Sequence, residues 1–204
     1  MPITKCTLGG VFTRSAIEFT QVSEFAVIAL AYFVGYLCVD YIVAPFQYSF
    51  LSRDVTVGSL LFIPHGIRVL SVWLCGSRAI LPLIISELLC TVFLWQPDVA
   101  LSSSLGSAMV GGLCVYLTFE LFRIAGIELR PDGKDSTLTN WRSLILLASI
   151  ASVFNSVGKQ IFFGSLAPLA DEISILVIFW IGDTLGTFAC LLLLITIRRR
   201  FRLW

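Results

Sequence analysis

Charged residues are scarce in this sequence. Asp, Glu, Lys and Arg together make up 13% of the 204 residues, while 57% of the residues are hydrophobic. An ordinary soluble domain carries about 25% charged residues. The composition therefore excludes a typical soluble globular protein and indicates an integral membrane protein. We expect the lipid bilayer to be its main partner, and we expect no nucleic acid among its partners.

Histidine is rare and paired cysteines are missing. The chain has a single histidine, His65, and six cysteines, of which no two form a C-x-x-C pair. A zinc or redox centre needs a closer cluster of such ligands, so we expect no metal and no cofactor. The N-terminal stretch MPITKCTLGGVFTRSAIEFT lacks an apolar core followed by a small-residue cleavage site. No removable signal peptide is expected there.

Long hydrophilic stretches and the common catalytic motifs are also missing. The longest hydrophilic stretch covers residues 129–142, which is too short for a catalytic domain. The sequence contains no G-x-S-x-G, H-E-x-x-H or C-x-x-C motif. We therefore expect a protein that is not an enzyme.

Long apolar runs are what the sequence has in abundance. A transmembrane helix needs about 20 mostly apolar residues, and six runs meet this requirement. They cover approximately residues 24–46, 57–76, 79–96, 100–122, 143–164 and 173–197. Because the runs are continuous rather than alternating, they predict helices. The expected fold is all-α, a polytopic membrane helical bundle with six transmembrane helices in a single domain over residues 1–204.

The basic residues indicate an orientation. Lys and Arg concentrate in the cytoplasmic loops of membrane proteins, and the C-terminal tail IRRRFRLW is strongly basic. If this tail is cytoplasmic, a six-helix topology places eleven of the fourteen Lys and Arg residues on the cytoplasmic side. The loops on the other side contain Asp54, Asp98, Asp171 and Glu172. We therefore expect both termini to be cytoplasmic.

Ionisable side chains fall inside the predicted helices, where a mid-helix charge costs about 2.5–3.5 kcal/mol. They are Asp40, His65, Arg68, Glu87, Lys159 and Asp183. His65 and Arg68 share a helix face because they are three residues apart. The short CGSR connection makes the next helix antiparallel, which predicts an Arg68–Glu87 pair. A Lys159–Asp183 pair is predicted at comparable depth, while Asp40 lies nearer the outer interface.

These charges have two interpretations. They are either structural ion pairs that fix the order of the helices or part of a ligand site. A polar stripe of Ser149, Ser152, Asn155, Ser156 and Lys159 along one helix face exceeds what two ion pairs require. On the second interpretation, the site is an outward-open pocket for a polar or anionic small molecule. The candidate ligand-binding residues are His65, Arg68, Glu87, Asn155, Lys159 and Asp183.

Proline and small residues predict local features of the bundle. Pro64, which precedes His65, is expected to kink its helix. Gly182 and Gly186 form a G-x-x-x-G motif, which lets helix backbones approach closely. The same spacing recurs in the pairs Ser102/Gly106, Ser107/Gly111 and Ala108/Gly112. We expect these pairs to support packing inside the bundle.

Two stretches resemble membrane-associated sensor domains of the MASE type. LLFIPHGIRVLSVWLCGSRAILPLIISELL (60–89) resembles their apolar Pro-x-Gly element, helix, short basic turn and Ile/Leu-rich helix. FWIGDTLGTFACLLLL (179–194) resembles their Trp-x-x-Asp-x-x-Gly segment. The order Pro64, Gly66, Arg68 is also similar to the hydrophobic part of the hexose-phosphate sensor kinases. The resemblance covers about a quarter of the chain.

The resemblance implies a protein of the bacterial inner membrane that senses small molecules for a kinase or a cyclic-dinucleotide enzyme. Because no output domain follows the helices, we expect the signal to pass to a separate protein partner. The cytoplasmic loop 123–142 and the basic tail are the surfaces expected to bind that partner.

The leading hypothesis is therefore a non-enzymatic, sensor-like or ligand-binding membrane module with a polar intramembrane centre. One alternative is a small transport component or substrate-capturing subunit, which would need an energising partner or an ion gradient because the sequence has no ATP-binding motif. Another alternative is a structural subunit of a larger membrane complex.

Overall fold

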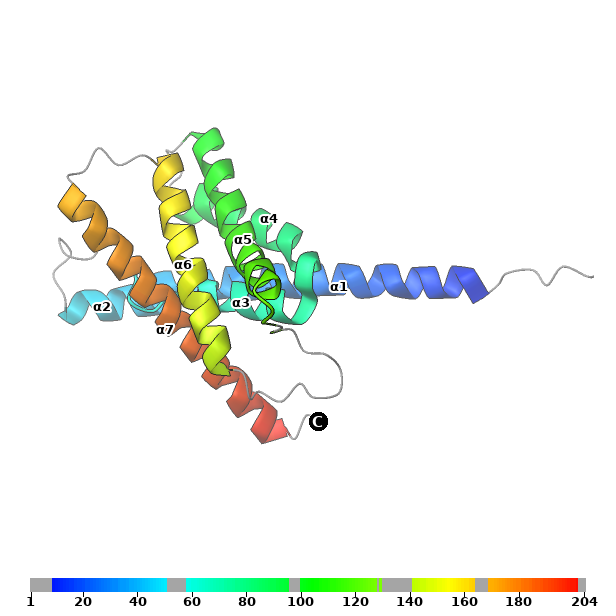
Figure 1. Cartoon of the computed structure of the whole chain (residues 1–204). Coiled ribbons are helices and arrows are strands. Elements are labelled where there is room, and N and C mark those ends of the chain that lie inside the picture. Colours follow the sequence, from blue (N-terminus) through cyan, green and yellow to red (C-terminus); the bar gives the residue numbers. More distant parts are fainter. Residues whose placement is uncertain are drawn as a thin grey trace, which may run out of the picture.

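The computed structural model describes residues 9–50, 58–95, 100–127, 129, 141–163 and 169–201. Within these residues every regular element is a helix. The α-helices are α1 (Gly9–Cys38), α2 (Ala44–Phe50), α3 (Ile63–Cys75), α4 (Ile80–Cys90), α5 (Leu101–Ile124), α6 (Trp141–Phe163) and α7 (Leu169–Phe201) (Figure 1). Three short helical turns extend or join them, namely η1 (Val39–Val43), η3 (Gly76–Ala79) and η4 (Thr91–Trp95).

Several helical stretches are long and apolar enough to cross a membrane. In the described part of the chain they are Gln21–Phe50, Ile63–Leu94, Leu101–Ile124, Trp141–Phe162 and Leu176–Ile197. The protein is thus an all-helical, multi-pass membrane protein. The predicted total of six spans is not confirmed, because the predicted spans 57–76 and 79–96 both fall in the stretch Ile63–Leu94.

The stretch Ile63–Leu94 reverses direction at its centre. Arg68 Nη2 on α3 donates a hydrogen bond to Glu87 Oε2 on α4, whereas a straight helix would separate positions 68 and 87 by about 28 Å along its axis. The reversal begins at Gly76, whose φ of 60° is a left-handed conformation that favours glycine. The turn η3 joins α3 to α4. The two helices pack mainly against other helices: α3 against α7 and α1, and α4 against α5 and α1.

A non-helical segment, residues 58–62, leads into α3 and lies against α7. The Phe62 backbone N–H donates to the Gly182 carbonyl at 2.9 Å. A Cβ atom added to Gly182 would overlap the Ser59 carbonyl oxygen, and one added to Gly186 would overlap the Phe62 carbonyl oxygen. Gly182 therefore receives the non-helical segment before α3, whereas Gly186 receives the start of α3 itself. A Cβ atom added to Gly66 of α3 would lie 2.7 Å from the Gly186 carbonyl oxygen, so the expected close approach of two helix backbones is present at Gly186.

Pro64 lies at the beginning of a helix and does not kink one, which corrects the expectation of a kink at this position. It lies in the first turn of α3, which starts at Ile63. Proline is well tolerated there because the first N–H groups of a helix have no partner within it. Within the predicted span 57–76, the helix thus begins at Ile63, and the backbone before it is non-helical.

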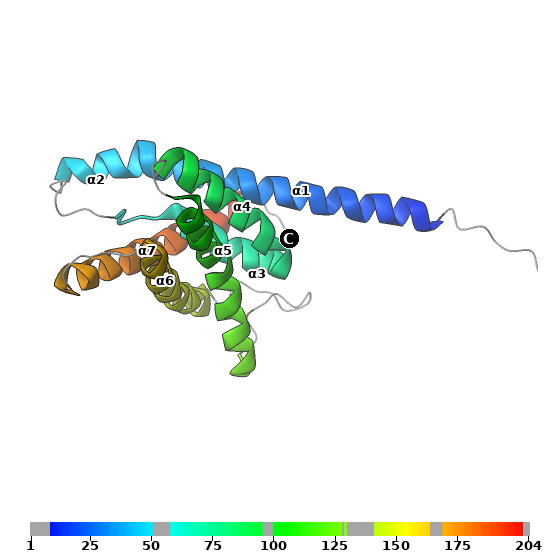
Figure 2. The same cartoon turned by 90° about the horizontal axis from the view of Figure 1, so that it is seen from above.

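Six of the described helices, α3 among them, form a closed ring of neighbours. Neighbouring pairs are α1 with α4, α4 with α5, α5 with α6, α6 with α7, α7 with α3 and α3 with α1. Because α3 also contacts α5 and α6, its side chains reach the centre of the bundle. In Figure 2, α3 and α4 lie between α1 on one side and α6 and α7 on the other.

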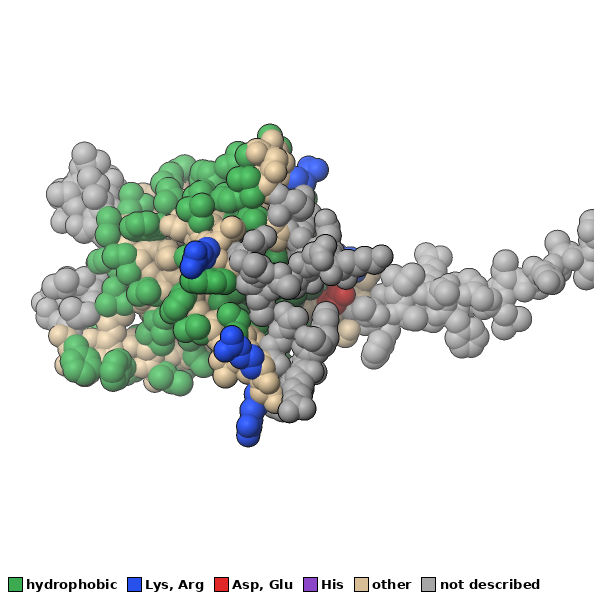
Figure 3. All heavy atoms as spheres, turned by 60° about the horizontal axis from the view of Figure 1, so that its bottom comes forward, with side chains coloured by type: hydrophobic (Ala, Val, Ile, Leu, Met, Phe, Trp, Pro, Cys, Tyr) green, Lys and Arg blue, Asp and Glu red, His purple; other side chains and the backbone are tan. Residues whose placement is uncertain are grey.

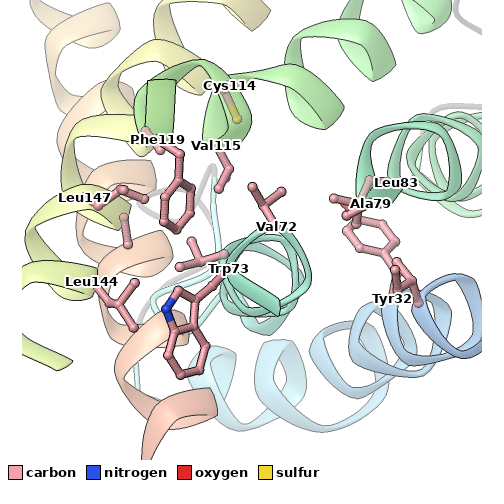
Figure 4. Close-up of a cluster of buried hydrophobic side chains, with 14 of the residues drawn as sticks. Tyr32, Val72, Trp73, Ala79, Leu83, Cys114, Val115, Phe119, Leu144 and Leu147 are labelled. Carbon is pink, nitrogen blue, oxygen red and sulfur yellow. The ribbon is translucent and has the colours of Figure 1, made fainter. Parts of the chain in front are cut away.

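Apolar side chains fill the bundle and also cover its outside. Inside, Val72 and Trp73 of α3 pack with residues of α5 and α6, and Tyr32 of α1 packs with Leu83 of α4 (Figure 4). Outside, hydrophobic side chains cover much of the described surface in Figure 3. An apolar exterior is expected where the surrounding solvent is lipid.

Candidate functional site

The six candidate residues from the sequence come together in the structure. Two of them are carboxylates, Glu87 on α4 and Asp183 on α7, and the other four contact these carboxylates. We call this group the polar centre, and it comprises His65, Arg68, Glu87, Asn155, Lys159 and Asp183. Five of these side chains are buried, and the Lys159 side chain is 17% exposed. Four helices (α3, α4, α6 and α7) contribute them, so the polar centre exists only in the folded bundle.

Glu87 accepts from three donors. Arg68 Nη2 and the Tyr32 hydroxyl both donate to its Oε2 atom, and Lys159 Nζ donates to its Oε1 atom at 2.6 Å. The predicted Arg68–Glu87 pair is therefore present. The predicted Lys159–Asp183 pair is wrong in its acidic partner, because the packing of α6 beside α5 brings the Lys159 ammonium to Glu87.

Arg68 is completely buried and is held by aromatic rings as well as by Glu87. Its guanidinium carbon lies 5.4 Å from the centre of the Tyr32 ring and 5.9 Å from that of the Phe62 ring. Its Nη2 atom also donates to the Tyr32 hydroxyl at 2.6 Å. Cation–π contacts of this kind are worth about 2 kcal/mol when desolvated. They offset part of the cost of removing the guanidinium from water.

A glycine on α5 makes room for this ion pair. A Cβ atom at Gly111 would lie 3.1 Å from Arg68 Nη2 and 3.1 Å from Glu87 Cδ. Gly111, of the predicted small-residue pair Ser107/Gly111, therefore lies against the charged side chains of the polar centre. The pair Ala108/Gly112 lies against α4, because a Cβ atom at Gly112 would meet the Ile84 backbone.

Asp183 has a different set of partners. Ser152 Oγ donates to its Oδ2 atom at 2.7 Å, and Asn155 Nδ2 donates to the same atom at 3.5 Å. The Nδ1 atom of His65 lies 3.4 Å from Oδ2. The other ring nitrogen of His65, Nε2, lies 3.1 Å from the Ala148 carbonyl oxygen on α6. Ser152 and Asn155 of the predicted stripe thus contact Asp183, whereas Ser149 accepts a hydrogen bond from Trp180 Nε1.

Helical spacing connects the two carboxylates. On α3, His65 contacts Asp183 and Arg68 contacts Glu87, and the two residues are three positions apart. On α6, Asn155 contacts Asp183 and Lys159 contacts Glu87, four positions apart. Positions three or four apart share a helix face. Each of these two helices therefore supplies one side chain to each carboxylate.

Several buried polar atoms of this region have no hydrogen-bond partner in the protein. They are His65 Nδ1, Arg68 Nε and Nη1, Ser104 Oγ, Ser107 Oγ, Asn155 Oδ1, Ser156 Oγ and Asp183 Oδ1. An unpaired buried polar group costs about 1–3 kcal/mol, and charged groups cost more. The set includes both donors and acceptors. The polar centre is therefore chemically suited to hold a small polar molecule.

Sequence reasoning missed Tyr32 and correctly separated Asp40. Tyr32 is fully buried and contacts both members of the Arg68–Glu87 pair. Its only signal in the sequence is a phenolic hydroxyl within an apolar helix, where a buried tyrosine needs a hydrogen-bond partner. Asp40 is exposed in η1. Among the described residues, no three His, Cys, Asp or Glu side chains are placed to hold a metal ion.

The predicted partner-binding surfaces lie largely outside the described residues. Of the loop 123–142, the structure describes residues 123–127, 129, 141 and 142, and of the tail it describes the part that continues α7 to residue 201. Trp73 Nε1 at the end of α3 donates to the Leu129 carbonyl at 2.8 Å. This bond connects the helix that carries His65 and Arg68 to the beginning of the loop.

Comparison with models of known protein families, with curated proteins and with solved structures gives no match for this chain.

Proposed function

We propose that this protein is a non-enzymatic, sensor-like membrane module that binds a small polar or anionic ligand at the polar centre. The observation that carries the proposal is the convergence of buried charged and polar side chains from four helices, several with unpaired atoms. A purely structural ion pair would not require the unpaired donors of Arg68 or the unpaired hydroxyl of Ser156. The location we propose is the bacterial inner membrane, with both termini in the cytoplasm.

The two stretches with MASE-type resemblance support this proposal by their position. Residues 60–89 contain α3 and α4, and residues 179–194 lie in α7. They meet where Phe62 bonds to Gly182 and where His65 approaches Asp183. The two stretches therefore contain four of the six residues of the polar centre, namely His65, Arg68, Glu87 and Asp183.

The bond between Trp73 and Leu129 supports a route for the signal. A ligand that contacts Arg68 or His65 acts on α3, and α3 is tied to the loop 123–142 through this bond. We propose that a separate protein partner reads the loop and the basic tail. A change in the position of α3 would then alter the surface presented to that partner.

The proposal is tested with serines whose hydroxyls have no partner. The Ser156→Ala variant removes a buried, unpaired hydroxyl, so it leaves the melting temperature of the unliganded protein unchanged or slightly raised. Purified protein is screened by thermal unfolding against sugar phosphates, carboxylates and amino acids. We expect one of these classes to raise the melting temperature of the natural chain and to raise that of Ser156→Ala less.

The matched control is Ser49→Ala, because Ser49 is exposed and its hydroxyl donates to the Phe46 carbonyl in its own helix. We expect this control to show the full ligand-induced shift. The proposal fails if none of the three classes stabilises the natural chain. It also fails if a stabilising ligand acts equally on Ser156→Ala, Ser104→Ala and Ser107→Ala.

A transport role is the second candidate, and the non-helical segment 58–62 favours it. Many secondary transporters place their substrate site where a membrane helix is interrupted and the backbone is non-helical. Here the interruption directly precedes His65. The transport proposal predicts that a radiolabelled solute accumulates in vesicles containing the protein, whereas a sensor binds the solute without accumulation.

A further inference from the structure

The hydrogen bonds of His65 fix which of its ring nitrogens carries a proton. Its Nε2 atom lies 3.1 Å from the Ala148 carbonyl oxygen, and a carbonyl oxygen only accepts hydrogen bonds. Nε2 is therefore protonated. In a neutral imidazole the other nitrogen, Nδ1, then has a bare lone pair.

That lone pair would face a carboxylate. Nδ1 lies 3.4 Å from Asp183 Oδ2, and both side chains are almost completely buried. Ser152 and Asn155 donate to the same Oδ2 atom, which is how donors surround an ionised carboxylate. A neutral His65 beside an ionised Asp183 would place two electron-rich atoms against each other in a buried site. One additional proton removes this conflict.

We propose that His65 and Asp183 share a bound proton, so that the polar centre is a proton-binding site. The proton comes from water and is carried on Nδ1, which faces Oδ2 at 3.4 Å, so that the pair is an imidazolium beside a carboxylate. The inference concerns regulation of the ligand site and in that respect rests on the proposed function. The proton itself is measurable without any ligand.

Charged and titratable groups surround His65 on every side. Asp183 on α7, Arg68 on the same helix and Lys159 on α6 act directly on it. Glu87 on α4, Tyr32 on α1 and Cys114 on α5 lie around its neighbour Arg68. Arg68 and Lys159 are engaged by Glu87, so Asp183 is the acid left to face His65.

The shared proton has two consequences. With it, three cationic side chains, His65, Arg68 and Lys159, meet two carboxylates, Glu87 and Asp183, so the polar centre carries a net positive charge. A net buried charge is costly and favours an anionic ligand. Loss of the proton leaves the contact between α3 and α7 without its attraction. Ligand binding and the position of α3 should therefore depend on pH.

The single histidine makes a direct experiment available. The natural chain, purified without a histidine tag, is labelled with ¹⁵N in the imidazole ring, so that every ring signal belongs to His65. Spectra are recorded in lipid nanodiscs from about pH 5 to about pH 9, the range that brackets ordinary histidine titration. We expect both ring nitrogens to carry a proton over part of this range, and we expect Nδ1 to lose its proton at the alkaline end.

Three variants separate a shared proton from simple packing. In Asp183→Asn we expect the Nδ1 proton to be lost at every pH of the series. In Ser152→Ala, Asp183 loses one donor to its ionised form, so the proton is retained to a higher pH. The control Asp40→Asn changes an exposed residue of η1 and leaves the spectra unchanged.

A bare Nδ1 atom in the natural chain throughout the pH series would overturn the inference. An Nδ1 signal that is identical in the natural chain and in both Asp183→Asn and Ser152→Ala would also overturn it. Because no ligand is present, either result leaves the ligand-binding proposal to be decided by its own experiment. Failure of the ligand screen would likewise leave the proton measurement intact.

Discussion

At the scale of single residues, the charged side chains of the polar centre are almost completely buried, away from water and lipid, and they are stabilised by pairing with one another. Arg68 is fully buried and Glu87 is 2% exposed. Removing one member of a buried pair usually costs about 3–5 kcal/mol, because the other member is left as an unpaired charge. Glu87 differs from a simple pair because Lys159 and Tyr32 also donate to it.

We predict that Arg68→Met lowers the free energy of unfolding by about 3 kcal/mol, the low end of this range, because Lys159 still faces Glu87. The loss in Lys159→Met is smaller, because its ammonium group is partly exposed. Thermal unfolding in detergent measures both. The matched control is Arg78→Met: the Arg78 side chain is 62% exposed, so its change stays within about 0.5 kcal/mol. Equal stability of all three variants would contradict the buried pair.

At the scale of elements, the unusual feature is the non-helical segment 58–62, which lies within the apolar run 57–76. Backbone groups in a membrane need partners within the protein. Gln47 of α2 supplies two, because its amide nitrogen donates to the Gly58 carbonyl and its amide oxygen accepts from the Leu60 N–H. Gly182 supplies a third through its carbonyl. The break before α3 is therefore held by side-chain and backbone bonds that replace a helix.

We predict that Gly182→Ala lowers the free energy of unfolding by about 1–3 kcal/mol, the usual cost of overpacking. The new methyl group would overlap the Ser59 carbonyl oxygen, which is backbone and cannot rotate away. The control is Gly35→Ala, whose methyl group would meet side chains and no backbone, namely the flexible end of Ile67 and, at 3.4 Å, the Cγ2 atom of Ile63. Thermal unfolding compares the two variants. If Gly182→Ala is tolerated as well as Gly35→Ala, the segment 58–62 does not lie against α7.

At the scale of the whole molecule, the reversal at Gly76 decides on which sides of the membrane the two termini lie. Helix α3 alone is about 20 Å long, which is shorter than a hydrocarbon core of about 30 Å. Residues 58–62, which contain bends at 58, 60 and 61, lengthen it by at most about 16 Å, the length of five strand residues. If this segment and α3 cross the membrane together and α4 returns, the number of crossings is even and both termini lie on one side.

We predict that the turn at Ser77 is cytoplasmic. Ser77 is exposed, so a Ser77→Cys variant in a chain without its native cysteines can be labelled with a membrane-impermeant maleimide. The references are Ser102→Cys and Arg123→Cys, exposed positions near opposite ends of α5. Labelling of Ser77→Cys should follow that of Arg123→Cys. Labelling that follows Ser102→Cys would show that the hairpin enters and leaves on the same side.

Much of the polar centre was predictable because its members are ionisable residues in apolar runs. Arg68 and Glu87 flank a short turn, which was sufficient to predict their pair. The acid that pairs with Lys159 was not predictable, because depth in the membrane is similar for Glu87 and Asp183. Tyr32 was missed because a tyrosine in an apolar helix gives little sign of whether its hydroxyl faces the centre or the lipid.

The sequence by itself determined that the chain forms apolar helices and that His65 and Arg68 share one face, because composition and helical period are local properties of the chain. It also determined that charges placed among these helices need partners. Only the tertiary structure decided that Gly182 receives the non-helical segment before α3, that Gly186 receives the start of α3, and that Lys159 pairs with Glu87. Those contacts depend on which helices become neighbours, and this is set by the packing of the whole bundle.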